Sequence, residues 1–183
     1  TVNHVDGDTI PKVVAGFDFG VALPWKHSSI WLRNSAGGAF GEPDDEFANF
    51  FFGGFGNNYV DRGSIKRYRE FYALPGFELN EVPGRNFVRT LLEWNLPPVR
   101  FDRVGTPGFY LSWARPAFFV SSLTTNLDER AIRREAQNAG VQVDFRFTAL
   151  SILNMTLSVG YAKGFGSDPI LDDDEFMVSL KIL

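Results

Sequence analysis

Residues 141–161, VQVDFRFTALSILNMTLSVGY, decide the fold. Apolar side chains alternate with polar or small ones from Val141 to Ala149, and again from Leu153 to Tyr161. Successive side chains of a strand point to opposite faces, so this period of two predicts two strands, each with one apolar and one polar face. The connection at Leu150-Ser151 is very short, which favours an antiparallel pair.

The same alternation recurs elsewhere in the chain. It is clear in 13–23 and 176–182, weaker in 88–96 and 109–114, and further strands are expected at 28–38, 49–56 and 62–69. The total is about nine strands. Several approach the roughly 9–11 residues with which a tilted strand crosses a bilayer, whereas strands of globular proteins average about 5–6 residues.

Composition narrows the class of protein. Aromatic residues make up 15% of the 183 residues, yet the mean hydropathy is only −0.10. A membrane barrel combines these properties because only alternate residues meet lipid. The net charge of −4 argues against a nucleic-acid binder, and the absence of cysteine excludes disulfides and thiolate metal sites. We therefore expect an all-β fold, an antiparallel transmembrane β-barrel segment with a polar lumen.

The connections alternate in length. Short turns at 24–27 and 150–151 are expected at one rim, and the long outer loops at the other rim are expected at about 42–47, 71–85, 124–139 and 164–174. The loop at 124–139 begins with a capping-box-like Thr125–Asp128 and is expected to hold a short helix. This pattern is typical of the bacterial outer membrane, with the long loops outside the cell.

The domain organisation follows from these strands. Residues 1–11 are expected to be a tail on the extracellular side, and 12–183 to be the barrel segment. Single-chain bacterial barrels have an even number of strands, so about nine strands imply that N-terminal strands are missing and that the same or a separate chain supplies them.

Several stretches resemble the C-terminal half of the BamA-type superfamily, the outer-membrane protein insertases and translocators also called bacterial surface antigens. They are 84–98, 109–114, 139–147, 153–162 and 174–183. The family signature is an Arg-Gly-aromatic loop tip that folds back into the lumen and meets acidic residues. Here Arg67-Tyr68 supplies the arginine and the aromatic ring without the glycine, Glu93 occupies an acidic position, and Ala114 replaces an aspartate.

The resemblance implies a role in the assembly or passage of polypeptides at the outer membrane. It implies an ion pair between Arg67 or Arg69 and Glu93 that holds the loop inside the barrel. The remaining predicted site residues are the lumen charges Asp18, Asp144 and Arg146, and a seam on the closing strand at Phe176, Val178, Leu180 and Ile182. Open strand edges template pairing, so this seam could receive an incoming strand.

The expected partners are outer-membrane lipids, the missing N-terminal strands, and client polypeptides or a periplasmic domain. No enzymatic activity, cofactor, metal or nucleic acid is expected, because only two histidines are present and no Gly-x-Ser-x-Gly motif occurs. Two alternatives remain. One is a passive structural barrel that anchors a periplasmic domain or partner subunit. The other is a soluble ligand-binding β-barrel, in which the apolar face would point inward.

Overall fold

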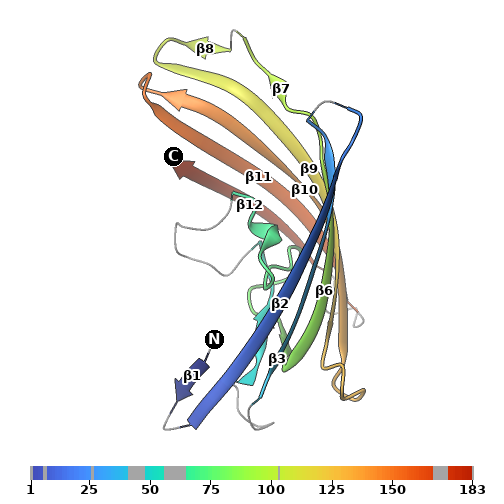
Figure 1. Cartoon of the computed structure of the whole chain (residues 1–183). Coiled ribbons are helices and arrows are strands. Elements are labelled where there is room, and N and C mark those ends of the chain that lie inside the picture. The colour runs from blue at the N-terminus through green and yellow to red at the C-terminus, as the bar shows by residue number, and fades with distance from the viewer. Residues whose placement is uncertain are drawn as a thin grey trace.

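The computed structural model describes residues 2–5, 8–25, 27–40, 48–55, 65–102, 104–166 and 173–182. One antiparallel, strongly curved sheet dominates these residues (Figure 1). Its strands, in sheet order, are β1 (Val2–Val5), β2 (Asp8–Ala22), β3 (Ser29–Ala39), β6 (Asn86–Asn95), β9 (Phe109–Thr125), β10 (Arg134–Ala149), β11 (Leu153–Gly166) and β12 (Asp174–Ile182). The short strands β7 (Val99–Arg100) and β8 (Gly105–Thr106) pair with β9. The predicted all-β antiparallel class is confirmed.

The sheet is not closed into a barrel. Among the described strands β12 pairs with β11 alone, and the opposite end of the sheet is formed by β1 and β2. The described residues contain no helix of the length and apolarity needed to span a membrane.

The hairpin of β10 and β11 is the one that 141–161 predicts. Val143 pairs with Val159 and Phe145 with Leu157, and the turn places Leu150 and Ser151 at positive φ angles of 51° and 64°. Both strands extend beyond the predicted stretch, which makes them 16 and 14 residues long.

The two faces of the sheet differ in chemistry. On β6 the outward-facing Val88 and Leu92 are 43% and 44% exposed, whereas the inward-facing Arg89 and Glu93 are 2% and 0% exposed. The convex face therefore carries exposed apolar side chains, and the concave face carries the buried charges. The concave side of β6 also buries Phe87 and Leu91, so apolar side chains lie on both faces, whereas a water-soluble antiparallel sheet leaves its polar face exposed.

The concave face is covered by residues 48–55 and 65–85, which together we call the inner segment (Figure 1). It contains β4 (Phe50–Phe52), paired with β5 (Val82–Gly84), and a 3-10 helix, η2 (Arg67–Arg69). Two groups of apolar side chains fix it to the sheet. Phe52, Leu74 and Val82 pack with Phe87 and Leu123, and a second group contains Phe55, Tyr68, Leu91, Phe119, Ala162 and Met177.

The strands predicted at 49–56 and 62–69 are not long sheet strands. β4 ends at Phe52 because Gly53 and Gly54 adopt positive φ angles of 154° and 65°, and a Cβ atom on Gly53 would lie 1.8 Å from the Glu78 carbonyl oxygen. Residues 67–69 form η2 instead of a strand, while 62–64 lie outside the described residues.

The loop predicted at 124–139 is also wrong in extent, and its helix is absent. β9 continues to Thr125 and β10 begins at Arg134, so only 126–133 form the connection. Asn126 has a φ of 53°, and its side chain accepts a hydrogen bond from Arg85 N at 3.0 Å and donates one to Ile132 O at 3.0 Å. These contacts and the strand pairing outweigh the local capping signal.

The remaining connections are partly described. The loop predicted at 71–85 belongs to the inner segment and turns onto the concave face, with Ala73 and Leu74 fully buried. The loop at 42–47 lies outside the described residues, as do 167–172 of the loop at 164–174. Within the predicted tail 1–11, β1 is present and β2 already begins at Asp8.

Candidate functional site

The contact between η2 and β6 is the centre of the site. Arg69 donates from Nε to Glu93 Oε2 at 2.8 Å and from Nη2 to Glu93 Oε1 at 2.5 Å. This two-point geometry matches the planar guanidinium to the planar carboxylate and is stronger than a single hydrogen bond. The structure thus brings together two of the three residues that the sequence analysis assigned to the loop tip. Arg67 lies on the same turn, half-buried, and forms no ion pair with the described residues.

Glu93 is surrounded by three cationic side chains. Besides Arg69, Lys66 Nζ lies 3.7 Å from Oε1 and Arg33 Nε lies 3.6 Å from Oε2. Arg33 also pairs with Asp18, whose side chain is 47% exposed. A fully buried carboxylate is costly unless it is paired and hydrogen-bonded, so this cluster satisfies Glu93 and at the same time fixes the inner segment to β3 and β6.

Lys66 is the member of this cluster whose pKa is lowered. Burial lowers its pKa from 10.5 to about 8, although the charges of Glu93 and Asp144 raise the pKa in part. Its Nζ donates to Asn95 Oδ1 at 2.5 Å. For Arg69, burial also lowers the pKa, but the hydrogen bonds and charge of Glu93 outweigh burial and the net pKa is raised.

Tyr68 makes two contacts of its own, one through its ring with β9 and one through its backbone with β6. Its ring is fully buried and stacks on Phe119 of β9, with centroids 4.1 Å apart and planes 15° apart. Arg89 of β6 donates to the Tyr68 carbonyl oxygen at 2.8 Å. Burial raises the pKa of the Tyr68 hydroxyl, so the group stays neutral. Ring stacking and the backbone hydrogen bond therefore hold the tip in one orientation.

A second anchor lies at the other side of the sheet, on the closing strand β12. Glu175 accepts two backbone hydrogen bonds from the inner segment, from Phe55 N to Oε1 at 3.1 Å and from Gly76 N to Oε2 at 3.1 Å. Gly76, with φ of 87°, crosses Gly164 of β11 so closely that a Cβ atom on Gly76 would lie 2.4 Å from Gly164 N. Only glycine permits this approach.

The other predicted charges lie on the concave face but outside the Glu93 cluster. Asp144 is 3% exposed and accepts hydrogen bonds from Gln142 Nε2 at 2.6 Å and Ser158 Oγ at 2.7 Å. Arg146 Nη1 contacts Thr156 Oγ1 at 3.5 Å. The Gln142 amide also donates to Ile65 O at 3.1 Å, so the polar part of β10 contacts the inner segment as well.

The residues of the predicted seam lie on the convex face of β12. Phe176, Val178, Leu180 and Ile182 are 67%, 59%, 49% and 63% exposed. Sequence reasoning overlooked Lys66, Arg33 and Glu175. The position of Arg33 could have been found by following the alternation of β3, and that of Glu175 from its place on the polar side of β12. Their partners depend on contacts across many residues and leave no local signal.

The described residues contain no group of three His, Asp or Glu side chains that could hold a metal ion. These contacts have a mechanical role, because they attach the inner segment to β3, β6, β9 and β12. Comparisons with protein families, with characterised proteins and with solved structures find no match to this chain.

Proposed function

We propose that this chain forms part of a transmembrane barrel in a bacterial outer membrane, with the convex face in lipid and the inner segment in the lumen. The exposed apolar side chains of the convex face support this proposal, because a water-soluble sheet would cover them. Strands from the same or another chain would close the sheet, since β12 has no second partner among the described residues.

The height of the apolar band carries the proposal. On β10 each outward-facing residue from Ala139 to Ala149 is apolar: Ala139, Val141, Val143, Phe145, Phe147 and Ala149. Ten residue steps at about 3.4 Å each make about 34 Å, and a tilt of about 40° reduces this to about 26 Å along the barrel axis. Outer-membrane barrels carry an apolar band about 25 Å tall, so the fit is close.

The finer role that we propose is the assembly or passage of polypeptides, as the resemblance to the BamA-type superfamily implies. The place of β12 at the end of the described sheet supports it, because a strand at the end of a sheet can offer backbone donors and acceptors to an incoming strand. Glu175 bonds β12 to the inner segment, so a displacement of the inner segment would also displace the edge of β12.

A passive anchoring barrel is the second candidate. The filled concave face favours it, because Tyr68, Phe52 and Leu74 are fully buried and the inner segment is attached at both sides of the sheet. A segment fixed in this way would plug a lumen and stiffen its wall. The two candidates differ in whether the β12 edge accepts a strand from a client.

Vesicle flotation tests the membrane proposal. The protein refolded with lipid vesicles is expected to float with them and to resist extraction at alkaline pH. Replacing Phe17 and Phe19, which are 63% and 56% exposed, with aspartate should abolish flotation, while Asp18→Asn on the opposite face of β2 should not. Wild-type protein that folds and stays in water without vesicles or detergent would contradict the proposal.

Disulfide trapping separates the two roles. The chain has no cysteine, so in a variant with the single substitution Val178→Cys every disulfide to another protein must form at position 178 of β12. Assembly of polypeptides predicts cross-links to client strands during their insertion. Cross-links only to the strand that completes the barrel would favour the anchor.

A further inference from the structure

A row of basic side chains crosses the concave face near the short turns. Its members are direct cross-strand partners on β7, β9, β10, β11 and β12, in that order: Arg100, Trp113, Arg146, Thr156 and Lys181. Direct partners share one face of a sheet, and Arg146 is two residues after the buried Asp144, so the row faces the concave side. The row contains three cations and no carboxylate. We call it the basic row.

The charges next to the basic row leave it positive. Arg115 lies two residues beyond Trp113 on the same face of β9, and its cross-strand partner is Asp144. Asp144 is only 3% exposed and already accepts hydrogen bonds from two neighbouring side chains. Asp102, two residues after Arg100, is a second and exposed carboxylate. Cations therefore outnumber carboxylates here among the described residues, although the whole chain has a net charge of −4.

The guanidinium groups in this region have donors to spare. Arg100, Arg115 and Arg146 form no ion pair with the described residues. Arg146 Nη1 contacts only Thr156 Oγ1, at 3.5 Å. Arg115 Nη2 donates to His27 O at 3.3 Å, while its buried Nε has no hydrogen-bond partner among the described residues. A buried donor without an acceptor costs free energy, and a carboxylate at this place would supply the acceptor.

The described part of the inner segment does not cover the basic row. Its hydrogen bonds nearest the short turns reach Asn95 and Gln142 of the sheet. Arg146 lies four residues beyond Gln142 on β10, toward the turn at 150–151. Figure 1 shows the ends of β9, β10 and β11 extending beyond the inner segment. Arg100 is exposed and Arg146 is partly exposed, so a ligand can reach both.

The spacing of the cations favours a chain over a single ion. Neighbouring strands lie about 4.8 Å apart, so successive cations of the basic row are about 10 Å apart and the row spans about 19 Å. An extended peptide advances about 3.4 Å per residue and points every second side chain the same way, so about six residues cover the row. A single phosphate would meet one of these cations at a time.

We propose that the basic row binds an extended acidic segment of a polypeptide. Aspartate or glutamate side chains on one side of the segment pair with Arg100 and Arg146, whose planar guanidinium groups match a carboxylate at two points. Arg115 adds a third guanidinium on the side of the inner segment. The inference rests on the proposed function and deepens it, because it names the charge of the polypeptides that would enter the lumen from the short-turn rim.

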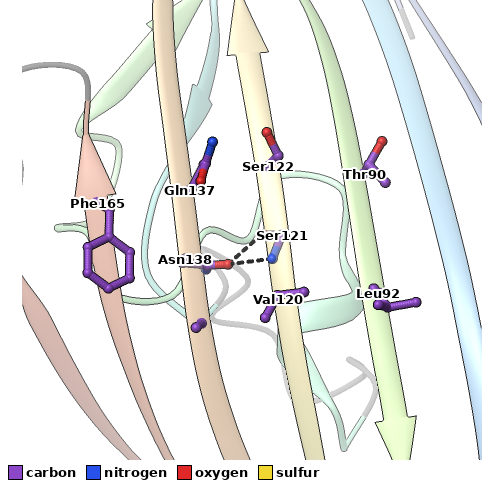
Figure 2. A pocket seen from close by; sticks show the side chains of 9 residues that line it. Thr90, Leu92, Val120, Ser121, Ser122, Gln137, Asn138 and Phe165 are labelled. Carbon is purple, nitrogen blue, oxygen red and sulfur yellow. Dashed lines mark hydrogen bonds between the residues drawn. The ribbon is translucent and has the colours of Figure 1, made fainter.

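A groove on the convex face offers a contrast (Figure 2). It has a volume of about 380 Å³ and lies over β6, β9, β10 and β11. The residues that line it, among them Thr90, Leu92 and Gln137, include no charged side chain. The groove therefore has no group that would select an acidic segment, and it supplies a control on the opposite face of β10.

Peptide binding in nanodiscs tests the basic row. The protein is inserted in nanodiscs of phosphatidylcholine, which carries no net charge, so that both rims are open to water. A fluorescent peptide of alternating serine and glutamate, about ten residues long and thus longer than the row, is titrated and its anisotropy is measured. A second peptide has glutamine in place of glutamate. The acidic peptide should bind saturably and roughly tenfold more tightly than the glutamine peptide.

Variants of the row should weaken this binding. The double variant Arg100→Gln with Arg146→Gln should lower the affinity for the acidic peptide roughly tenfold, as expected for the loss of two partly exposed ion pairs. Arg146→Lys should lower the affinity less, because the charge remains and only the two-point geometry is lost.

Arg134→Gln and Gln137→Ala are the matched controls. Arg134 shares the concave face of β10 with Arg146 but lies at the other end of the strand, and Gln137 lines the convex groove. Both substitutions should leave the affinity unchanged.

Three results would overturn the inference and leave the proposed function standing. They are equal binding of the two peptides by inserted wild type, an equal loss of affinity in Arg134→Gln, and displacement of the peptide by inorganic phosphate at the same low concentration. The last result would describe a site for a single anion. Failure of the wild type to insert in lipid would instead refute the proposed function, and the inference with it.

Discussion

The two faces of β6 have the same backbone and opposite chemistry. Val88 and Leu92 leave 43% and 44% of their surface exposed on the convex side, while Arg89 and Glu93, which directly follow them in sequence, are almost fully buried on the concave side. In a water-soluble protein the hydrophobic effect would exchange these roles. The difference shows that the buried side of this sheet combines apolar packing, by Phe87 and Leu91 among others, with paired charges and hydrogen bonds. The convex side leaves its apolar side chains exposed.

The largest expected effect comes from removing the shared carboxylate on the concave face. Glu93→Gln leaves Arg69, Lys66 and Arg33 facing a neutral group in a buried site, which should lower the free energy of unfolding by about 3–5 kcal/mol. Urea unfolding of the protein in vesicles measures this. Asp18→Asn is the control, since its exposed pair with Arg33 should contribute about 0–1 kcal/mol. Equal losses in the free energy of unfolding for Glu93→Gln and Asp18→Asn would contradict the claim that burial makes the Glu93 cluster the more stabilising of the two.

The convex face should respond to charge in the opposite way. Val143 lies near the middle of the apolar band, so Val143→Arg should cost about 2–4 kcal/mol, the penalty for a cation at the bilayer midplane. Ser179→Arg places the same side chain on the concave side of β12, opposite Ser158, which is bonded to Asp144, and should cost far less. The same urea titration compares both. A larger loss for Ser179→Arg would reverse the assignment of the faces.

The second anchor should be weaker than the Glu93 cluster. Glu175→Ala leaves the amides of Phe55 and Gly76 without their acceptor, at an expected cost of about 1–3 kcal/mol. Hydrogen–deuterium exchange should show both amides losing protection. Asp174→Ala, whose side chain is on the opposite face of β12, is the matched control. Unchanged exchange at Phe55 and Gly76 would remove Glu175 from the contacts that hold the inner segment.

The stability of the folded protein should also depend on pH. Lys66 has a pKa of about 8 in the folded protein and 10.5 as its ordinary value, so between these pH values the unfolded chain binds more protons. Stability should therefore rise as the pH increases from about 8 to 10.5. The groups around Lys66 are Glu93, Asp144, Arg69 and Arg115, and Lys66→Met should flatten the rise. Thermal unfolding at several pH values across this range measures the slope of stability against pH. If the wild type and Lys66→Met had the same slope, the pH dependence would not arise from Lys66.

The regular strands could be predicted from the sequence because their alternation is a local property. The hairpin at 141–161 and the strands near 13–23, 28–38 and 176–182 all occur in the structure. The inner segment could not be predicted in the same way. Phe50–Phe52 has strand-like residues, but Gly53 and Gly54 turn the chain onto the sheet, and long-range contacts determine where it docks.

Only part of the candidate site could be predicted from the sequence. Arg69 and Glu93 were singled out by resemblance to a signature, and they do meet. Glu175 lies 120 residues from Phe55 and 99 residues from Gly76, so the second anchor depends on how the sheet curves. Lys66 follows the same logic, since its partner Asn95 is 29 residues away. Such pairs are set by register and curvature, for which no short stretch of sequence carries a signal.

The environment of the two faces can be measured directly along β10. Because the chain lacks cysteine, single cysteines can be introduced at each position from Ala139 to Ala149 and labelled with a fluorophore in vesicles that contain spin-labelled lipid. Labels at Val141, Val143, Phe145 and Phe147 are expected to be quenched, and labels at Gln142, Asp144 and Thr148 are expected to be protected. Quenching without a period of two, or quenching of Gln142, Asp144 and Thr148 alone, would contradict the claim that the convex face meets lipid.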